Sequence, residues 1–216
     1  LGVDEKDINS LARSLESLLS EHPADHHVLA AAARLVSVVP SPFAPSASGR
    51  LLDRVSAGLS SPSGTTRVSC LKICISLISA GHGDPAAAAQ TTSVAGAGDV
   101  LSQLLDLETH PLGADSGRHA TVALSRVQNL IEYRRIPDGV VTPCVRGLLG
   151  LLHFKLSSYW GPAAKALAAA VDAFPDKAWP ILVESLRQVE AEVQMATDDD
   201  GDGEQADDNG DGEQTD

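Results

Sequence analysis

Residues 148–186 read LLGLLHFKLSSYWGPAAKALAAAVDAFPDKAWPILVESL, and this stretch decides the fold class. Its leucines and alanines recur at intervals of three and four residues, the spacing of one face of an α-helix. Pro162 and Pro175 divide the stretch, because proline is tolerated in the first turn of a helix but interrupts its interior. We therefore predict one helix over 163–174 and another that starts at 176 and continues to 195.

The same helical spacing extends toward the N-terminus. Further helices are predicted over 8–19, 26–39, 48–59, 65–79, 99–107, 118–133 and 137–153. Asp25 is predicted to cap the helix over 26–39, because its carboxylate can accept hydrogen bonds from the first free N–H groups. That helix is apolar nearly all round, which predicts an inner position.

The composition also favours helices over strands. Hydrophobic residues make up 43% of the 216 residues and aromatic residues only 3%. Alanine and leucine, which dominate, are good helix formers, whereas sheets use more β-branched and aromatic residues. No apolar run reaches the roughly 20 residues of a membrane-spanning helix.

Paired helices that recur at roughly 40 residues are typical of HEAT and armadillo arrays. We therefore predict an all-α fold, a HEAT/armadillo-like α-solenoid of helical hairpins, with a compact helical bundle as the alternative. The predicted organisation is helical repeats over 1–80, a flexible Gly/Ala/Ser/Thr-rich insertion over 81–98, helical repeats over 99–196 and a disordered acidic low-complexity tail over 197–216. Because no signal-peptide pattern follows Leu1, we interpret the chain as an internal fragment.

The formal net charge of −13 comes mainly from the tail. Residues 198–216 contain ten of the 29 acidic residues and no lysine or arginine, which leaves 19 acidic and 16 basic residues elsewhere. Asp198, Asp200 and Asp202 resemble the start of a calcium loop, but Asn209 stands where such a loop needs a bidentate acid. The tail is therefore predicted to be a disordered acidic linker, with weak divalent-cation binding as the alternative.

Other candidate sites are explained by packing or solvation. Cys70, Cys74 and Cys144 are predicted to be buried reduced thiols, because no further zinc-type ligands stand nearby. The histidines around Pro23 are predicted to be solvated at a helix junction; these are His22, His26 and His27. No nucleophile–base pattern or phosphate-binding glycine loop is present, so we predict no catalytic residue, no metal ion and no cofactor.

Two groups of residues are candidates for contact with nucleic acid. The best candidates for contacting RNA phosphates are Arg118, Arg126, Arg134, Arg135 and Lys155. Solvation or pairing with nearby acids is their alternative role.

Trp160 and Trp179 are predicted to pack between repeats, with base stacking as the alternative.

A family resemblance covers 118–186. The segments ALSRVQNLIEYRRIPDGVV at 123–141 and LLGLLHFKLSSYWGPAAKALAAAVDAFPDKAWPILVESL at 148–186 resemble the HEAT-repeat scaffold of the small-subunit processome, the "down-regulated in metastasis" family associated with small nucleolar RNA. Residues that carry the resemblance are Leu148–Leu149–Gly150–Leu151–Leu152, Lys155, Trp160, Pro162 and Trp179. They are packing residues, so the resemblance implies a fold and no site chemistry.

The resemblance implies a non-enzymatic scaffold segment in small-subunit ribosome biogenesis. Such a segment would act in the nucleus and nucleolus, and its partners would be processome proteins, small nucleolar ribonucleoprotein and pre-rRNA. No membrane and no small-molecule substrate is expected. A helical-repeat adaptor in nuclear transport or phosphatase scaffolding is the alternative function, while a helical enzyme domain has no supporting residues.

Overall fold

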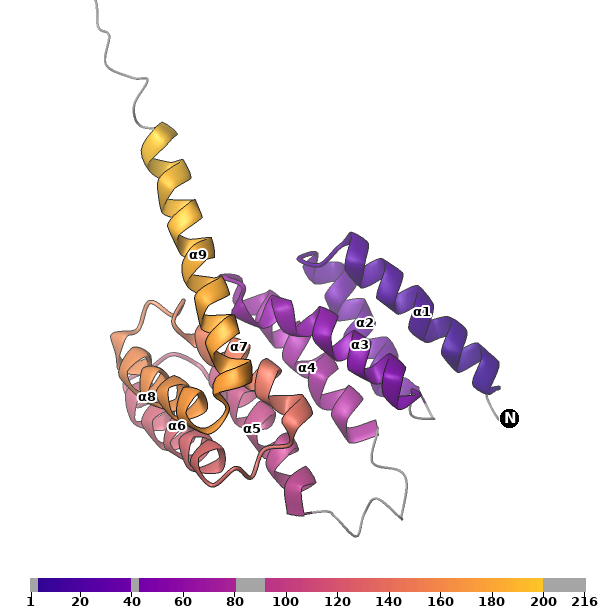
Figure 1. Ribbon diagram of the computed structural model, residues 1–216, viewed down its shortest axis with the longest axis horizontal. Helices are drawn as coiled ribbons and strands as arrows, with labels where there is room; N and C mark the ends of the chain where they lie inside the picture. Colours follow the sequence, from indigo (N-terminus) through magenta and orange to yellow (C-terminus); the bar gives the residue numbers. More distant parts are fainter. Residues whose placement is uncertain (1–3, 40–42, 81–91, 200–216) are drawn as a thin grey trace, which may run out of the picture. The chain divides into compact units, whose positions relative to one another are not determined.

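The computed structural model describes residues 4–39, 43–80 and 92–199 (Figure 1). Within these ranges the chain is helical and contains no strand, which confirms the predicted all-α fold. The calcium-loop candidate in the tail and positions 81–91 of the predicted insertion lie outside the described residues.

The described helices follow one another in a simple order. They are α1 (Glu5–Glu21), α2 (His26–Val38), α3 (Pro45–Ser56), α4 (Gly64–Ala80), α5 (Thr92–Thr109), α6 (Ser116–Glu132), α7 (Val141–Leu151), α8 (Ser157–Ala173) and α9 (Pro175–Asp199). Two short 3-10 turns, η1 (Ala57–Ser60) and η3 (Asp138–Val140), lead out of α3 and into α7.

Local sequence signals explain two of the helix starts. Asp25 caps α2 as predicted: its Oδ1 accepts hydrogen bonds from the backbone N–H groups of His27 at 2.8 Å and Val28 at 3.3 Å. These hydrogen bonds lower the pKa of the Asp25 carboxyl. Pro143 lies in the first turn of α7, where a backbone N–H would have no partner within the helix.

The first eight helices form two blocks of stacked hairpins. In the block α1–α4, α1 packs on α2 and α3 on α4, while α1 also packs on α3 and α2 on α4. In the block α5–α8, the same pattern joins α5 to α6, α7 to α8, α5 to α7 and α6 to α8. Each helix therefore packs on its neighbour and on the next helix but one.

The junction between the blocks breaks this pattern. A regular array would pack α3 on α5 and α4 on α6, whereas here α4 packs on α5 and α7 packs on both α3 and α4. Helix α7 approaches η1 closely at Gly150, where an added Cβ would meet the Leu59 carbonyl oxygen and lie 2.5 Å from Arg67 Cδ. A glycine is therefore required where α7 crosses the first block.

Helix α2 is not the inner helix that its composition predicted. Leu29 and Ala32 are buried, but Leu35 is 43% exposed and Val38 is 72% exposed. Helices α1 and α4 cover one face of α2, and the prediction was wrong because apolar content alone does not show how many neighbours a helix has.

The prediction that the two tryptophans pack in the core was also wrong. Trp160 is 48% exposed and Trp179 is 58% exposed. The buried face of α8 is instead formed by Tyr159 and by alanines such as Ala163 and Ala166. Small side chains let α6 and α8 approach closely and leave no space for an indole between them.

Three boundaries differ from those predicted. Helix α8 begins at Ser157 rather than at 163, so Pro162 lies inside the helix and not before it. Helix α5 begins at Thr92, inside the stretch predicted as a flexible insertion, and α9 ends at Asp199, inside the predicted tail. Alanine is the strongest helix former, so the Val-Ala-Gly-Ala sequence at 94–97 can extend α5 toward the N-terminus despite its glycine.

The chain divides into two units, Leu1–Ile181 and Leu182–Asp216, and the boundary falls within α9. None of the helices in the described ranges has the length and apolar character needed to cross a membrane.

Candidate functional site

The predicted RNA-contact residues lie along the pair formed by α6 and α8. At one end, Gly117 approaches α8 so closely that an added Cβ would lie 3.1 Å from Ser158 Cβ. At the other end, the Arg134 guanidinium lies 5.8 Å from the centre of the Phe174 ring. These two contacts join the beginnings and the ends of the helices, so α6 and α8 run in the same direction.

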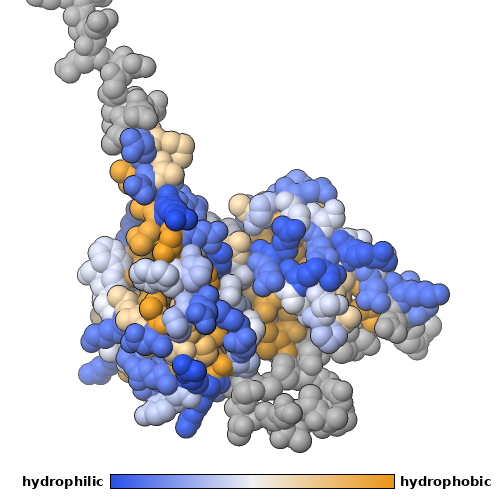
Figure 2. All heavy atoms as spheres, in the orientation of Figure 1, coloured by the Kyte–Doolittle hydropathy of each residue, from blue (hydrophilic) through white to orange (hydrophobic). Residues whose placement is uncertain are grey.

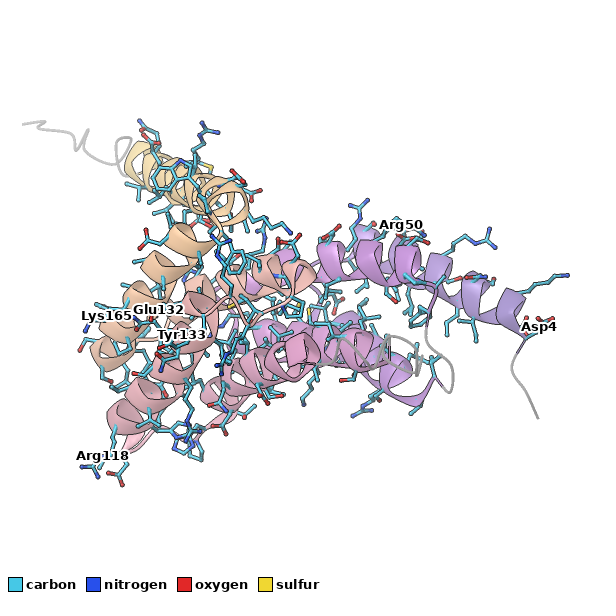
Figure 3. All side chains as sticks on the ribbon, turned by 60° about the horizontal axis from the view of Figure 1, so that its bottom comes forward. Asp4, Arg50, Arg118, Glu132, Tyr133 and Lys165 are labelled. Atoms are coloured by element: carbon cyan, nitrogen blue, oxygen red, sulfur yellow. The ribbon has the colours of Figure 1, made fainter. Side chains whose placement is uncertain are left out.

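This arrangement separates the predicted residues rather than forming one patch. Arg118 lies in the first turn of α6, and Lys155 lies two residues before α8, so both belong to one end of the pair. Arg134 and Arg135 follow α6 at the opposite end, about 24 Å away at 1.5 Å of rise per residue. Figure 3 shows Arg118 and Tyr133 at opposite ends of α6.

Arg134 ends α6 in an unusual backbone conformation. Its φ is 48°, and among the described residues it is the only non-glycine residue with a positive φ. The Arg134 N–H donates to the Ile131 carbonyl and the Arg135 N–H to the Leu130 carbonyl, both at 2.9 Å. This is a Schellman cap, a structure that usually has glycine at the left-handed position.

Arg126 and Arg135 are brought together in an open groove between α5 and α6. The groove has a volume of about 560 Å³ and is lined by Asp99, Gln103, Arg126, Asn129, Leu130, Tyr133 and Arg135. Tyr133 is 69% exposed, and the Arg135 guanidinium lies 5.4 Å from its ring centre. An exposed aromatic ring beside guanidinium and amide groups can stack on a base and contact a phosphate.

A second basic groove was missed by sequence reasoning. It lies where α2, α4 and α5 meet, has a volume of about 370 Å³ and includes Arg34 and Lys72 among three serines, Ser37, Ser69 and Ser76. No sequence signal predicted it, because Arg34 and Lys72 come from different helices and neither stands in a basic run.

A buried polar cluster joins the two blocks. The Arg67 guanidinium donates to Glu108 in a bidentate pair, Nε to Oε1 at 2.6 Å and Nη2 to Oε2 at 2.9 Å. Arg67 Nη1 donates to the carbonyls of Ser61 at 2.8 Å and Pro62 at 3.0 Å.

The aromatic rings of α8 and its preceding turn complete the cluster. Phe154 lies beneath the Arg67 guanidinium, 5.3 Å from it, and stacks on Tyr159.

Tyr159 is fully buried, and its hydroxyl has no hydrogen-bond partner among the described residues. Burial raises the pKa of Tyr159, and the negative charges of Glu108 and Asp106 raise it further. The side chains of Arg67 and Glu108 are buried and paired with each other, so the cluster holds α4 and α5 together at the junction.

The cysteines and the histidines near Pro23 lie as predicted. Cys70, Cys74 and Cys144 are buried and free, and burial raises the pKa of Cys70 and of Cys144 to about 12. Burial raises the pKa of Cys74 as well. The three histidines at 22, 26 and 27 are exposed.

No family model matches this chain, and comparisons with curated proteins and with solved structures likewise find no match.

Proposed function

We propose that this chain is a non-enzymatic helical-repeat scaffold segment that binds proteins of the small-subunit processome during pre-rRNA processing in the nucleolus. The family part of the proposal rests on the resemblance over 118–186. The stacked hairpins support the repeat part, because packing of each helix on the next helix but one is how α-solenoids build a continuous core.

The exposed apolar stripe of α9 is the observation that carries the binding function. Leu186, Val189 and Val193 are 68%, 52% and 58% exposed. With Leu182 they are spaced by four, three and four residues, the heptad spacing of a coiled-coil seam. Figure 2 shows hydrophobic residues gathered along this helix. A stripe of this kind is suited to docking one amphipathic helix.

Charge identifies the kind of helix that would dock. Glu190 and Glu192 flank the α9 stripe at the positions that set partner choice in a coiled coil. Ten acidic residues follow from position 198. A second copy of the chain would bring like charges together, so the occupant we propose is a partner helix whose apolar seam is flanked by lysine and arginine.

RNA contact is assigned to the groove between α5 and α6. Arg126 and Arg135 supply two positive charges, and Tyr133 supplies an exposed ring. Only part of the folded surface is basic, so we propose that this groove holds a short single-stranded stretch of pre-rRNA rather than a duplex.

The proposal is tested by affinity purification of the tagged protein, followed by identification of copurifying proteins and RNA. A matched pair of variants uses the α9 stripe: Leu186→Glu with Val193→Glu introduces two charges on the apolar face, and Gln188→Glu with Ala191→Glu introduces the same charge elsewhere on the helix. We expect the first variant to lose processome proteins and the second to retain them.

The copurifying RNA and proteins distinguish the two candidate functions. Small-subunit pre-rRNA together with small nucleolar ribonucleoprotein supports the scaffold function, as does nucleolar accumulation of a fluorescent fusion. Recovery of transport cargo, a small GTPase or phosphatase subunits would instead support the adaptor function and contradict the proposed one.

A further inference from the structure

Three metal-ligating side chains meet where α5 ends and α6 begins. Asp106, His110 and His119 each offer one ligand atom, and these atoms all lie within 4.8 Å of one another. His110 directly follows α5, and its backbone N–H donates to the Asp106 carbonyl at 2.8 Å, which places the two residues one turn apart. His119 reaches them from α6. Asp106 is exposed, and the two histidines are partly exposed.

The three side chains are already in contact. His119 Nε2 lies 2.8 Å from Asp106 Oδ2, and the His110 and His119 rings stack with centres 4.1 Å apart and planes inclined by 15°. The pair of imidazoles with a carboxylate is a donor set that suits zinc and other divalent transition metals. We propose that Asp106, His110 and His119 bind a Zn²⁺ ion.

Small side-chain rotations bring the three groups into coordination geometry. Ligand atoms about 2.0–2.2 Å from a tetrahedral zinc ion are about 3.3–3.5 Å from each other, which lies between the 2.8 Å contact and the 4.8 Å limit found here. A zinc ion lies in the plane of each imidazole that binds it, so one of the stacked rings turns about its Cβ–Cγ bond. Partial solvent exposure leaves room for that rotation.

The ion would join α5 to α6 and keep a coordination position open. Three protein ligands leave the fourth position of a tetrahedral zinc ion to water or to a residue of a binding partner. The site shares no residue with the α5–α6 groove or with the α9 stripe, so this inference does not depend on the proposed scaffold function.

The test is a zinc titration of the full chain by calorimetry at neutral pH, in excess Mg²⁺. Magnesium ions occupy the carboxylates of the acidic tail but compete poorly for imidazole. We expect one zinc ion per chain in the wild type, and substitution of cobalt for zinc should give the visible absorption of a tetrahedral site. Zinc should also raise the melting temperature.

Matched histidine variants locate the ion. His110→Ala and His119→Ala should each weaken binding by roughly tenfold or more, because loss of a direct ligand costs at least as much as loss of an outer-shell partner. The control variant, His26→Ala with His27→Ala, removes two exposed histidines elsewhere and should bind zinc as the wild type does. Circular dichroism checks that each variant is folded.

Other results would overturn the assignment. If the wild type binds no zinc, or if His110→Ala and His119→Ala bind it unchanged, the three residues are not a metal site. If Asp106→Asn, which keeps the shape of the side chain, leaves both affinity and the cobalt spectrum unchanged, the carboxylate is not a ligand.

Discussion

Arg67 and Glu108 form a bidentate ion pair between α4 and α5 whose side chains are only 5% and 2% exposed. The pair crosses the junction at which the regular stacking of hairpins is interrupted. Arg67 Nη1, the guanidinium nitrogen outside the bidentate pair, donates to two backbone carbonyls just before α4. Because a buried ion pair requires a definite geometry, this contact fixes the register of one block against the other.

Removing one member of this pair should be strongly destabilising. Arg67→Ala or Glu108→Ala leaves a buried charge without its partner, and we expect a loss of about 3–5 kcal/mol in the free energy of unfolding. Urea denaturation of each variant measures this loss. The exposed pair Arg50–Glu16 is the control, and Arg50→Ala should change stability little. Equal losses for both pairs would contradict the structural role of Arg67.

Two glycines should respond to alanine in opposite directions. Gly150→Ala places a methyl group against the Leu59 carbonyl and Arg67 Cδ, and we expect a loss of about 1–3 kcal/mol from overpacking. Gly49→Ala meets nothing within 4 Å in α3 and should stabilise by about 0.5–1 kcal/mol. Thermal and urea unfolding of both variants test the two signs together.

The buried hydroxyl of Tyr159 should be dispensable for stability. It has no hydrogen-bond partner among the described residues, so Tyr159→Phe removes a polar group whose burial is uncompensated. We expect a gain of up to about 1–2 kcal/mol. Tyr133→Phe, at an exposed position, is the control and should be neutral. A clear loss on Tyr159→Phe would show that the hydroxyl has a partner.

Replacing Arg134 should separate stability from RNA binding. Arg134→Gly relieves the left-handed conformation of the Schellman cap, and we expect a gain of up to about 1 kcal/mol. Arg134→Ala removes the guanidinium without that relief and should not stabilise. Arg134 does not line the α5–α6 groove, so both variants should leave the salt dependence of single-stranded RNA binding unchanged, whereas Arg135→Ala should lower it. An unchanged salt dependence for Arg135→Ala would contradict RNA contact in the groove.

The three cysteines should make stability fall at alkaline pH. Their folded-state pKa values are raised above the ordinary value of 9.0, to about 12 for Cys70 and Cys144. Below pH 9 the thiols are protonated in both states. Above pH 9, only the unfolded chain releases these protons. The free energy of unfolding therefore decreases by about 1.4 kcal/mol for each cysteine and each pH unit.

Urea denaturation from pH 8 to 10.5 measures this slope. Cys144→Ala should reduce the part of the slope that comes from the three cysteines by one third, whatever the variant's stability at neutral pH. The native protein should also react slowly with a thiol reagent until it unfolds. An unchanged slope for Cys144→Ala would mean that the thiol ionises equally in both states.

The sequence predicts the helices well because local signals decide them. Asp25 is a helix cap, and Pro175 marks a helix boundary; both act on their own few residues. The predicted burial of Cys70 and Cys74 also holds, because helical spacing places them on one apolar face. Such features need no knowledge of the partner helix.

Long-range features could not be predicted in the same way. Arg67 and Glu108 are 41 residues apart, and neither position has a local signal of pairing. Asp106 and His110 do have helical spacing, but His119 joins them only through the packing of α6 on α5. Trp160 was misplaced because the closeness of α6 to α8, not its own hydrophobicity, excludes it from the core.

The return of α7 to the first block sets the order in which the protein can be completed during synthesis. His153 Nε2 lies 3.0 Å from the carbonyl oxygen of Ser60, a residue 93 positions earlier. At roughly 5–20 residues per second, translation takes roughly 5–20 s to supply that partner. During this interval the surface of η1 and α4 that α7 covers in the folded protein has no partner, so the first block is completed only when α7 emerges.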